Sequence, residues 1–144
     1  MSAKQTRESV LAYGHENIQA THPSTLMFTK EKHLSKTGDC IVAVAADKAV
    51  ADLSRELREK LKKPNAKLTI TIEAAGLTQR INASGSPKLV LTNQTDMVIR
   101  KGDYISDRTL AVHADKSAND LPRGFVERLK NPEQKIKITL IVDA

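Results

Sequence analysis

Apolar and polar residues alternate most clearly in two segments of the chain, 67–73 and 135–140. A period of two places the apolar side chains on one face and the polar side chains on the other, as in a strand with one buried face. Shorter apolar runs between glycine- and proline-containing turns predict further strands. These lie at 9–13, 25–30, 40–45, 78–83, 88–92, 97–100 and 108–113. The pattern therefore predicts a mainly β protein.

Apolar residues at helical spacing precede each of the two alternating segments. The first set is Val50, Leu53, Leu57 and Leu61, and the second is Leu121, Phe125 and Leu129. Each set predicts a helix that buries one side. Pro64 and Pro132 are expected to end the two helices, because proline lacks an amide donor and disfavours a helical residue before it. Asp120, two residues before Pro122, is predicted to cap the second helix.

This order of elements occurs twice, and the sequence repeats with it. Residues 44–72 align without a gap on 112–140, with about half of the positions identical, and a weaker match continues back to Gly14 and Gly85. We therefore predict one domain, 1–144, made of two related halves at about 5–72 and 76–142. Because neither half can bury its apolar faces alone, the halves should pack about a pseudo-two-fold axis. A β-sandwich or a closed barrel with two helices outside satisfies this requirement.

Composition narrows the class of protein further. The chain has 40% hydrophobic and 28% charged residues, which is typical of a globular protein. It contains no apolar run long enough to span a membrane and no N-terminal signal-peptide pattern, so we expect no membrane partner. A lone cysteine, Cys40, excludes an internal disulfide and suits a reducing compartment. The predicted location is the cytoplasm.

Polar residues that the two halves do not share are the better candidates for a specialised site. In the first half they include His15, Asn17, His22 and Cys40, and Asp39 precedes the cysteine. These residue types bind zinc and other divalent transition metals, although their spacing alone does not require a metal. The leading hypothesis is a small-ligand or metal-ion site at the junction of the halves. A catalytic role, with Cys40 as nucleophile and a histidine as base, stays open.

The net charge of +6 supports a second hypothesis, in which the protein binds RNA or another polyanion. The basic residues that suit a phosphate or carboxylate are Arg100, Lys101, Arg108, Lys116 and Arg123. Two observations weaken this hypothesis. Acidic and basic residues are interleaved in 55–60, as on a solvated helix face, and aromatic residues make up only 3% of the chain. Nucleic acid is therefore the less favoured partner.

Four aspartates are present at equivalent positions of both halves: Asp47 with Asp115, and Asp52 with Asp120. Shared residues are expected to serve the shared fold. We interpret these aspartates mainly as helix caps and as first-turn charges that favour a helix N-terminus. The alternative is a symmetric site at the pseudo-two-fold axis.

Several short sequence motifs resemble those of a known family. They are Gly14-His15-Glu16-Asn17-Ile18, Ala20-Thr21-His22-Pro23-Ser24-Thr25, Gly38-Asp39-Cys40-Ile41, Arg100-Lys101, Arg108-Thr109-Leu110 and Ala114-Asp115-Lys116. In this order, over nearly the whole chain, they resemble an archaeal family known as domain of unknown function 371. The resemblance implies a mainly β, jelly-roll-like sandwich in an archaeal cytoplasm. It implies no activity.

Overall fold

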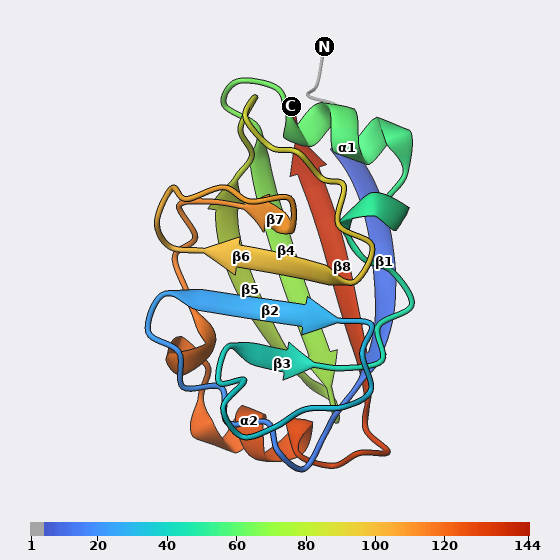
Figure 1. Ribbon diagram of the computed structural model, residues 1–144, viewed down its shortest axis with the longest axis vertical. Coiled ribbons are helices and arrows are strands. Elements are labelled where there is room, and N and C mark those ends of the chain that lie inside the picture. Colours follow the sequence, from blue (N-terminus) through green and yellow to red (C-terminus); the bar gives the residue numbers. More distant parts are fainter. Residues whose placement is uncertain (1–4) are drawn as a thin grey trace.

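Two four-stranded sheets stack on each other in the computed structural model, which describes residues 5–144 (Figure 1). The long sheet has the order β1 (Gln5–Tyr13), β8 (Lys135–Asp143), β4 (Lys67–Ala74) and β5 (Leu77–Ser84), and its neighbouring strands are antiparallel. The short sheet has the order β3 (Ile41–Ala43), β2 (Thr25–Thr29), β6 (Asp96–Arg100) and β7 (Thr109–Ala111). In Figure 1 the strands of the short sheet cross those of the long sheet.

The predicted mainly β fold with two helices is confirmed, whereas the closed-barrel alternative is wrong. Each sheet ends in two edge strands, and single bridges, Tyr13 with Val44 and Ser84 with Val112, join the sheets at their corners. A barrel would require continuous pairing around the whole sheet. A jelly roll is built of antiparallel strands, but β2 pairs with β3, and β6 with β7, in parallel.

The helices α1 (Arg55–Leu61) and α2 (Arg123–Leu129) lie at opposite ends of the stacked sheets (Figure 1). The predicted continuous helix from Val50 is wrong. A 3₁₀ turn, η1 (Val50–Asp52), comes first, and Leu53 is then extended with a ψ of 150°. The Ser54 hydroxyl oxygen accepts a hydrogen bond from the Leu57 N–H (3.1 Å), so α1 begins afresh after this cap.

The second half has the same arrangement, and it corrects the predicted role of Asp120. This residue ends the 3₁₀ turn η2 (Ala118–Asp120), and its carboxylate accepts the Ser117 N–H at 2.8 Å. Pro122, not Asp120, occupies the N-cap position of α2. Asp120 therefore closes the 3₁₀ turn rather than capping α2.

The other shared aspartates protect the edges of the long sheet instead of capping helices. Asp47 accepts the Leu11 N–H of β1 at 3.0 Å, and Asp115 accepts the Asn82 N–H of β5 at 2.9 Å. Both strands are edge strands, whose free N–H groups would otherwise be open to pairing with another chain. The helix-cap interpretation is therefore wrong for this pair.

The predicted strand at 88–92 is also wrong, because this segment is a loop. Leu91 has a φ of 57°, a left-handed conformation that a strand cannot contain. The N–H groups of Thr92 and Asn93 both donate to the Asp107 carbonyl oxygen, at 3.3 and 3.1 Å. The loop is thereby tied to the segment before β7.

The two halves have equivalent topology and connections. Exchanging β1 with β5, β2 with β6, β3 with β7 and β4 with β8 reproduces both strand orders in reverse. The loop after β1 and the loop after β5 are held alike: the His15 N–H donates to Leu129 O (3.0 Å), and the Ser86 N–H donates to Leu61 O (2.9 Å). Even the left-handed residues recur, at Ala45 (φ 51°) and at His113 (φ 53°).

The apolar core fills the space between the sheets. Phe28 of β2, Ile70 of β4 and Ile138 of β8 are fully buried there, and the helices add Leu57 and Leu129. None of the helices within 5–144 is both long enough and apolar enough to cross a membrane.

Candidate functional site on the outer face of the short sheet

The two central strands of the short sheet turn polar side chains away from the core. Leu26 and Phe28 of β2 belong to the core, so the residues between and beside them lie on the opposite, outer face. Across the strand pair on this outer face, Thr25 lies opposite Arg100, Met27 opposite Val98 and Thr29 opposite Asp96. Asp96 is nevertheless buried, with 7% of its surface exposed.

Two arginines and one aspartate occupy this face. Arg108 Nη1 contacts Asp96 Oδ2 at 3.0 Å, whereas Asp96 Oδ1 is buried without a hydrogen-bond partner. The Arg100 guanidinium lies 5.0 Å from the centre of the Tyr104 ring, and its Nε is also buried without a partner. Burial lowers the pKa of Arg100, and the positive charge of Arg108 lowers it further. The buried Asp96 carboxylate thus pairs with Arg108, and the charge of Arg108 in turn acts on Arg100.

Cys40 lies beside these arginines. Its carbonyl oxygen accepts the Met27 N–H at 2.9 Å, which fixes it against β2. Burial raises the pKa of the Cys40 thiol and the charge of Asp39 raises it further, while Arg108 and Arg100 act in the opposite direction. Cys40 and the two arginines, predicted from the sequence to belong to separate sites, lie close together in the structure.

His15 and Asn17 hold the loop after β1. His15 Nδ1 accepts the Asn17 N–H at 3.0 Å, and the Asn17 side-chain amide donates to Leu34 O at 2.7 Å. The His15 N–H donates to Leu129 O at the end of α2. These contacts give both residues a role in fixing the loop.

His22 also forms hydrogen bonds with the backbone. Its Nδ1 accepts the N–H groups of Ser24 and Thr25, both at 3.1 Å, and its own N–H donates to Asp39 O at 3.2 Å. Each of the two rings therefore has only Nε2 left for a metal. Within 5–144, no three His, Cys, Asp or Glu side chains are grouped so that they could hold a metal ion. The metal-ion site on His15, Asn17, His22, Asp39 and Cys40 stays a prediction.

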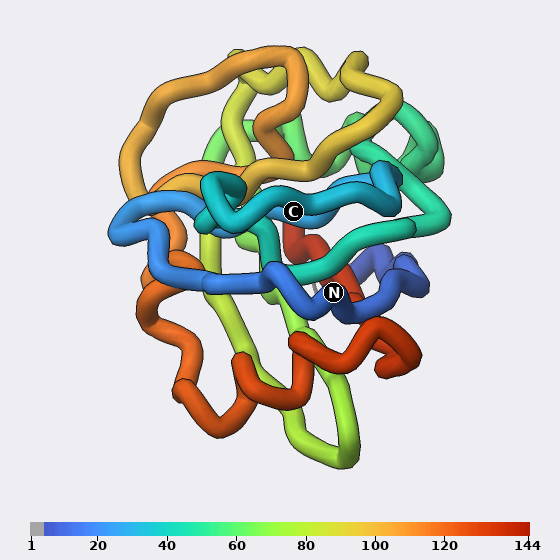
Figure 2. Tube along the Cα trace, turned by 60° about the horizontal axis from the view of Figure 1, so that its bottom comes forward, coloured from blue at the N-terminus to red at the C-terminus, as the bar shows by residue number. Residues whose placement is uncertain are grey.

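Of the remaining members of the predicted basic cluster, Lys101 and Arg123 already bind other groups of the protein. Lys101 Nζ pairs with Asp120 at 2.7 Å, and this contact, with the Ser117 N–H, lowers the pKa of Asp120 to about 2. Lys116 is half-buried. Arg123 donates to the carbonyl oxygens of five residues: Gln19, Ala20, Ala118, Asn119 and Leu121. It thereby ties the loop after β1 to η2, which lie side by side in Figure 2.

A hollow of about 280 Å³ lies between the loops that follow β5 and β6. Its polar lining includes Ser86, Lys88, Asp103 and His113. At the equivalent place in the first half, the hydrogen bond from Asn17 to Leu34 O joins the two loops. Lys88 stands where the first half has Asn17, so this bridge is specific to the first half.

Sequence reasoning missed Asp96 and Tyr104. The signal was present in β6, where Asp96 and Arg100 fall on the same face of a strand that is otherwise apolar. Charged residues are rarely buried unless they are paired, so two opposite charges within an otherwise apolar strand mark it for attention.

The comparisons with known proteins place the chain in a family. The chain belongs to the family described as "Domain of unknown function (DUF371)", which matches residues 10–143. It is 44% identical over 127 residues to an uncharacterised protein, MJ0206, of Methanocaldococcus jannaschii, covering 88% of this chain and 93% of the relative. The resemblance seen in the sequence is therefore confirmed. Neither description states an activity.

Proposed function

We propose that this protein binds a small anion, a carboxylate or a phosphate, on the outer face of the short sheet. The observation that carries the proposal is the Arg100 Nε, a buried donor with no hydrogen-bond partner beside a second guanidinium. A buried unpaired donor is unfavourable by about 1–3 kcal/mol, and more for a charged group. An anion oxygen would satisfy this donor and balance the second positive charge.

The neighbours of Arg100 suit such a ligand. Guanidinium groups pair with carboxylate and phosphate oxygens in a bidentate manner. The Tyr104 ring lies within cation–π distance of the Arg100 guanidinium and favours its positive charge. The raised pKa of Cys40 favours the neutral thiol, which neither competes with an anion for the arginines nor acts as an activated nucleophile. These features support binding over thiolate chemistry.

We also propose that the halves, about 5–72 and 76–142, arose by duplication within one domain. The sequence repeat, the matching strand orders and the recurring loop hydrogen bonds support this origin. On this proposal the anion site lies at the junction, because Thr25 and Cys40 belong to the first half and the arginines to the second. Cys40, the sole cysteine and a free thiol, supports a reducing location such as the cytoplasm.

Titration with inorganic phosphate and with acetate, followed by amide chemical shifts, tests the anion site. We expect shifts around Arg100 and Cys40 in the wild-type protein, and at least tenfold weaker binding in Arg100→Gln. Arg55→Ala is the matched control, because Arg55 is exposed on α1 and forms a surface ion pair with Glu59. It should bind as the wild type does.

Alkylation of Cys40 provides a second readout that does not depend on chemical shifts. A bound anion adds negative charge beside the thiol and should slow its reaction with iodoacetamide. The proposal fails if millimolar phosphate and acetate leave the wild-type spectrum unchanged, or if Arg100→Gln, shown to be folded by circular dichroism, binds as tightly as the wild type.

A further inference from the structure

The long sheet has an open outer face on the side of the molecule opposite to the anion site. Its outward residues follow from the strand registers and the alternating burial. Five of them are basic: Arg7, Lys67, Arg80, Lys135 and Lys137. The helices lie at the ends of the stack and leave this face uncovered (Figure 1). The face therefore presents a basic surface to solvent.

Within residues 5–144, these five cations are not neutralised by ion pairs. Within the described part of the chain, none of them lies within 4.0 Å of a carboxylate, whereas Lys48, Lys101 and Arg108 all do. The same face carries two acids, Glu73 and Asp143, and Asp143 accepts a hydrogen bond from Gln5. With five basic and two acidic residues, this face has a net charge of +3.

The centre of the face is neutral and rich in hydrogen-bonding groups. Between the cations lie Ser9, Thr69, Thr71 and Thr78, together with Asn82, whose side-chain amide donates to Asp115 at 3.0 Å. Lysine, arginine, serine, threonine and asparagine are the side chains that contact phosphate and sugar in nucleic-acid complexes. Rows of outward residues along a strand are about 6.6 Å apart, since each residue rises by roughly 3.3 Å.

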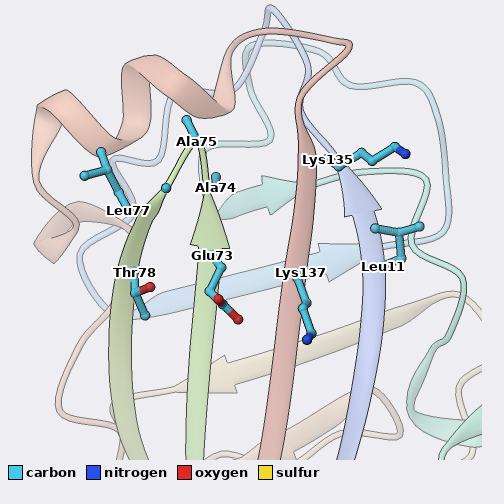
Figure 3. Close-up of a pocket in the computed structure, with 9 residues that line it drawn as sticks. Leu11, Glu73, Ala74, Ala75, Leu77, Thr78, Lys135 and Lys137 are labelled. Atoms are coloured by element: carbon cyan, nitrogen blue, oxygen red, sulfur yellow. The ribbon is translucent and has the colours of Figure 1, made fainter.

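One end of this face is hollowed. The hollow has a volume of about 360 Å³, and its lining includes Leu11, Glu73, Thr78, Lys135 and Lys137. In Figure 3, Lys137 and Glu73 extend from neighbouring strands on the same side of the sheet, with Leu11 on the next strand. Leu11 is 38% exposed and offers an apolar contact beside the two lysines.

We propose that the outer face of the long sheet binds the phosphate backbone of a nucleic acid without reading its sequence. The unpaired cations supply the electrostatic attraction, and the hydroxyl and amide groups supply hydrogen bonds to phosphate and sugar. Base stacking needs exposed aromatic rings, and the one aromatic residue on this face, Tyr13, is half-buried at its margin. Backbone contacts without stacking give binding that depends steeply on salt and little on sequence.

Fluorescence anisotropy with a labelled single-stranded RNA and a labelled DNA duplex of mixed sequence tests this proposal. The face variant is Lys67→Ala/Arg80→Ala/Lys137→Ala. The control, Lys32→Ala/Lys36→Ala/Lys88→Ala, removes the same charge from exposed loops. We expect at least tenfold weaker binding by the face variant, with a salt slope reduced by about 2 units because each lost phosphate contact removes roughly 0.7–0.9. The control should stay within about threefold of the wild type.

Three results would overturn the proposal. The first is that the wild type binds neither nucleic acid at low salt, and the second is that the two triple variants lose the same affinity. The third is that polyglutamate competes as well as RNA at equal charge, which would assign the face to acidic proteins. Arg100→Gln should leave nucleic-acid binding unchanged, so the outcome here is distinguishable from that of the anion site.

Discussion

His22 and Asn93 accept the same pair of backbone hydrogen bonds in the two halves. His22 Nδ1 takes the N–H groups of Ser24 and Thr25 at 3.1 Å, and Asn93 Oδ1 takes those of Thr95 and Asp96 at 2.9 and 2.8 Å. Asparagine commonly accepts such bonds in a turn. The imidazole of His22 therefore replaces an asparagine side chain at the start of β2.

This relationship predicts that His22→Asn preserves the turn, whereas His22→Ala destroys it. We expect the alanine variant to lose about 1 kcal/mol of unfolding free energy, as in the loss of a side-chain cap. The asparagine variant should stay within about 0.5 kcal/mol of the wild type. Urea unfolding measures both. Equal losses in the two variants would show that the ring contributes by packing and not by accepting the N–H groups.

His22→Ala also tests the metal site predicted from the sequence. That prediction requires one equivalent of a divalent transition metal in the purified wild-type protein and loss of the metal from the alanine variant. Elemental analysis by mass spectrometry measures the content directly. Metal far below one equivalent in the wild type, after purification without chelators, contradicts the prediction.

Arg123 and Arg55 occupy equivalent positions but make different contacts, and their variants should differ accordingly. Arg123 donates to carbonyls in both halves, whereas Arg55 forms one exposed ion pair with Glu59. Hydrogen bonds from a charged donor contribute about 1.5–3 kcal/mol, so Arg123→Ala should destabilise the protein by that order. Exposed ion pairs contribute about 0–1 kcal/mol, so Arg55→Ala should be nearly neutral.

Thermal unfolding of the two arginine variants, side by side, gives the comparison. Arg123→Lys serves as an additional probe, since an ammonium keeps the charge but cannot reach several carbonyls at once. If this lysine variant is as stable as the wild type, the charge and not the forked guanidinium holds the loop.

The sequence predicted the strands best where alternation was long. Segments 67–73 and 135–140 lie inside β4 and β8, because each has one face on the core and one in solvent. The prediction failed at 88–92, where Leu89 and Leu91 are buried although they lie in a loop and not in a strand. The pattern of apolar residues indicates which positions are buried but not their backbone conformation. The left-handed φ of Leu91 therefore could not be predicted from it.

The candidate site could also be predicted only in part from the sequence. Separate sequence features marked Cys40 and the two arginines, but their meeting depends on the pairing of β2 with β6, which connects distant segments. The two histidines were marked for their chemistry, whereas the structure uses their Nδ1 atoms to hold turns. Residue type predicts what a side chain can do, and the pairing of strands decides which partner it meets.

Gly14 and Gly85 are predicted to tolerate no side chain, since each packs against the end of a helix. A Cβ on Gly14 would lie 2.3 Å from Leu129 O, and one on Gly85 would lie 2.1 Å from Leu61 O. Each alanine variant should lose about 1–3 kcal/mol or more, as expected for overpacking. Gly124→Ala is the control: its Cβ meets nothing within 4 Å, and alanine favours a helix by up to about 1 kcal/mol. If urea unfolding shows that Gly14→Ala is more stable than Gly124→Ala, the close approach of Gly14 to Leu129 O is contradicted.

The ion pair of Asp120 with Lys101 predicts a dependence of stability on acid pH. Lys101 and the Ser117 N–H lower the pKa of Asp120 from 3.8 to about 2 in the folded protein. Because the folded value lies below the unfolded value, the carboxylate stabilises the fold above about pH 4, and this contribution is lost as the pH falls toward 2. The difference in unfolding free energy between the wild type and Asp120→Asn should therefore be constant near neutral pH and shrink in acid.

The same substitution in a Lys101→Ala background should show a smaller dependence on pH, because the two residues are coupled. A difference between wild type and Asp120→Asn that stays constant from pH 7 to pH 2 would mean that the pair makes no net contribution to stability.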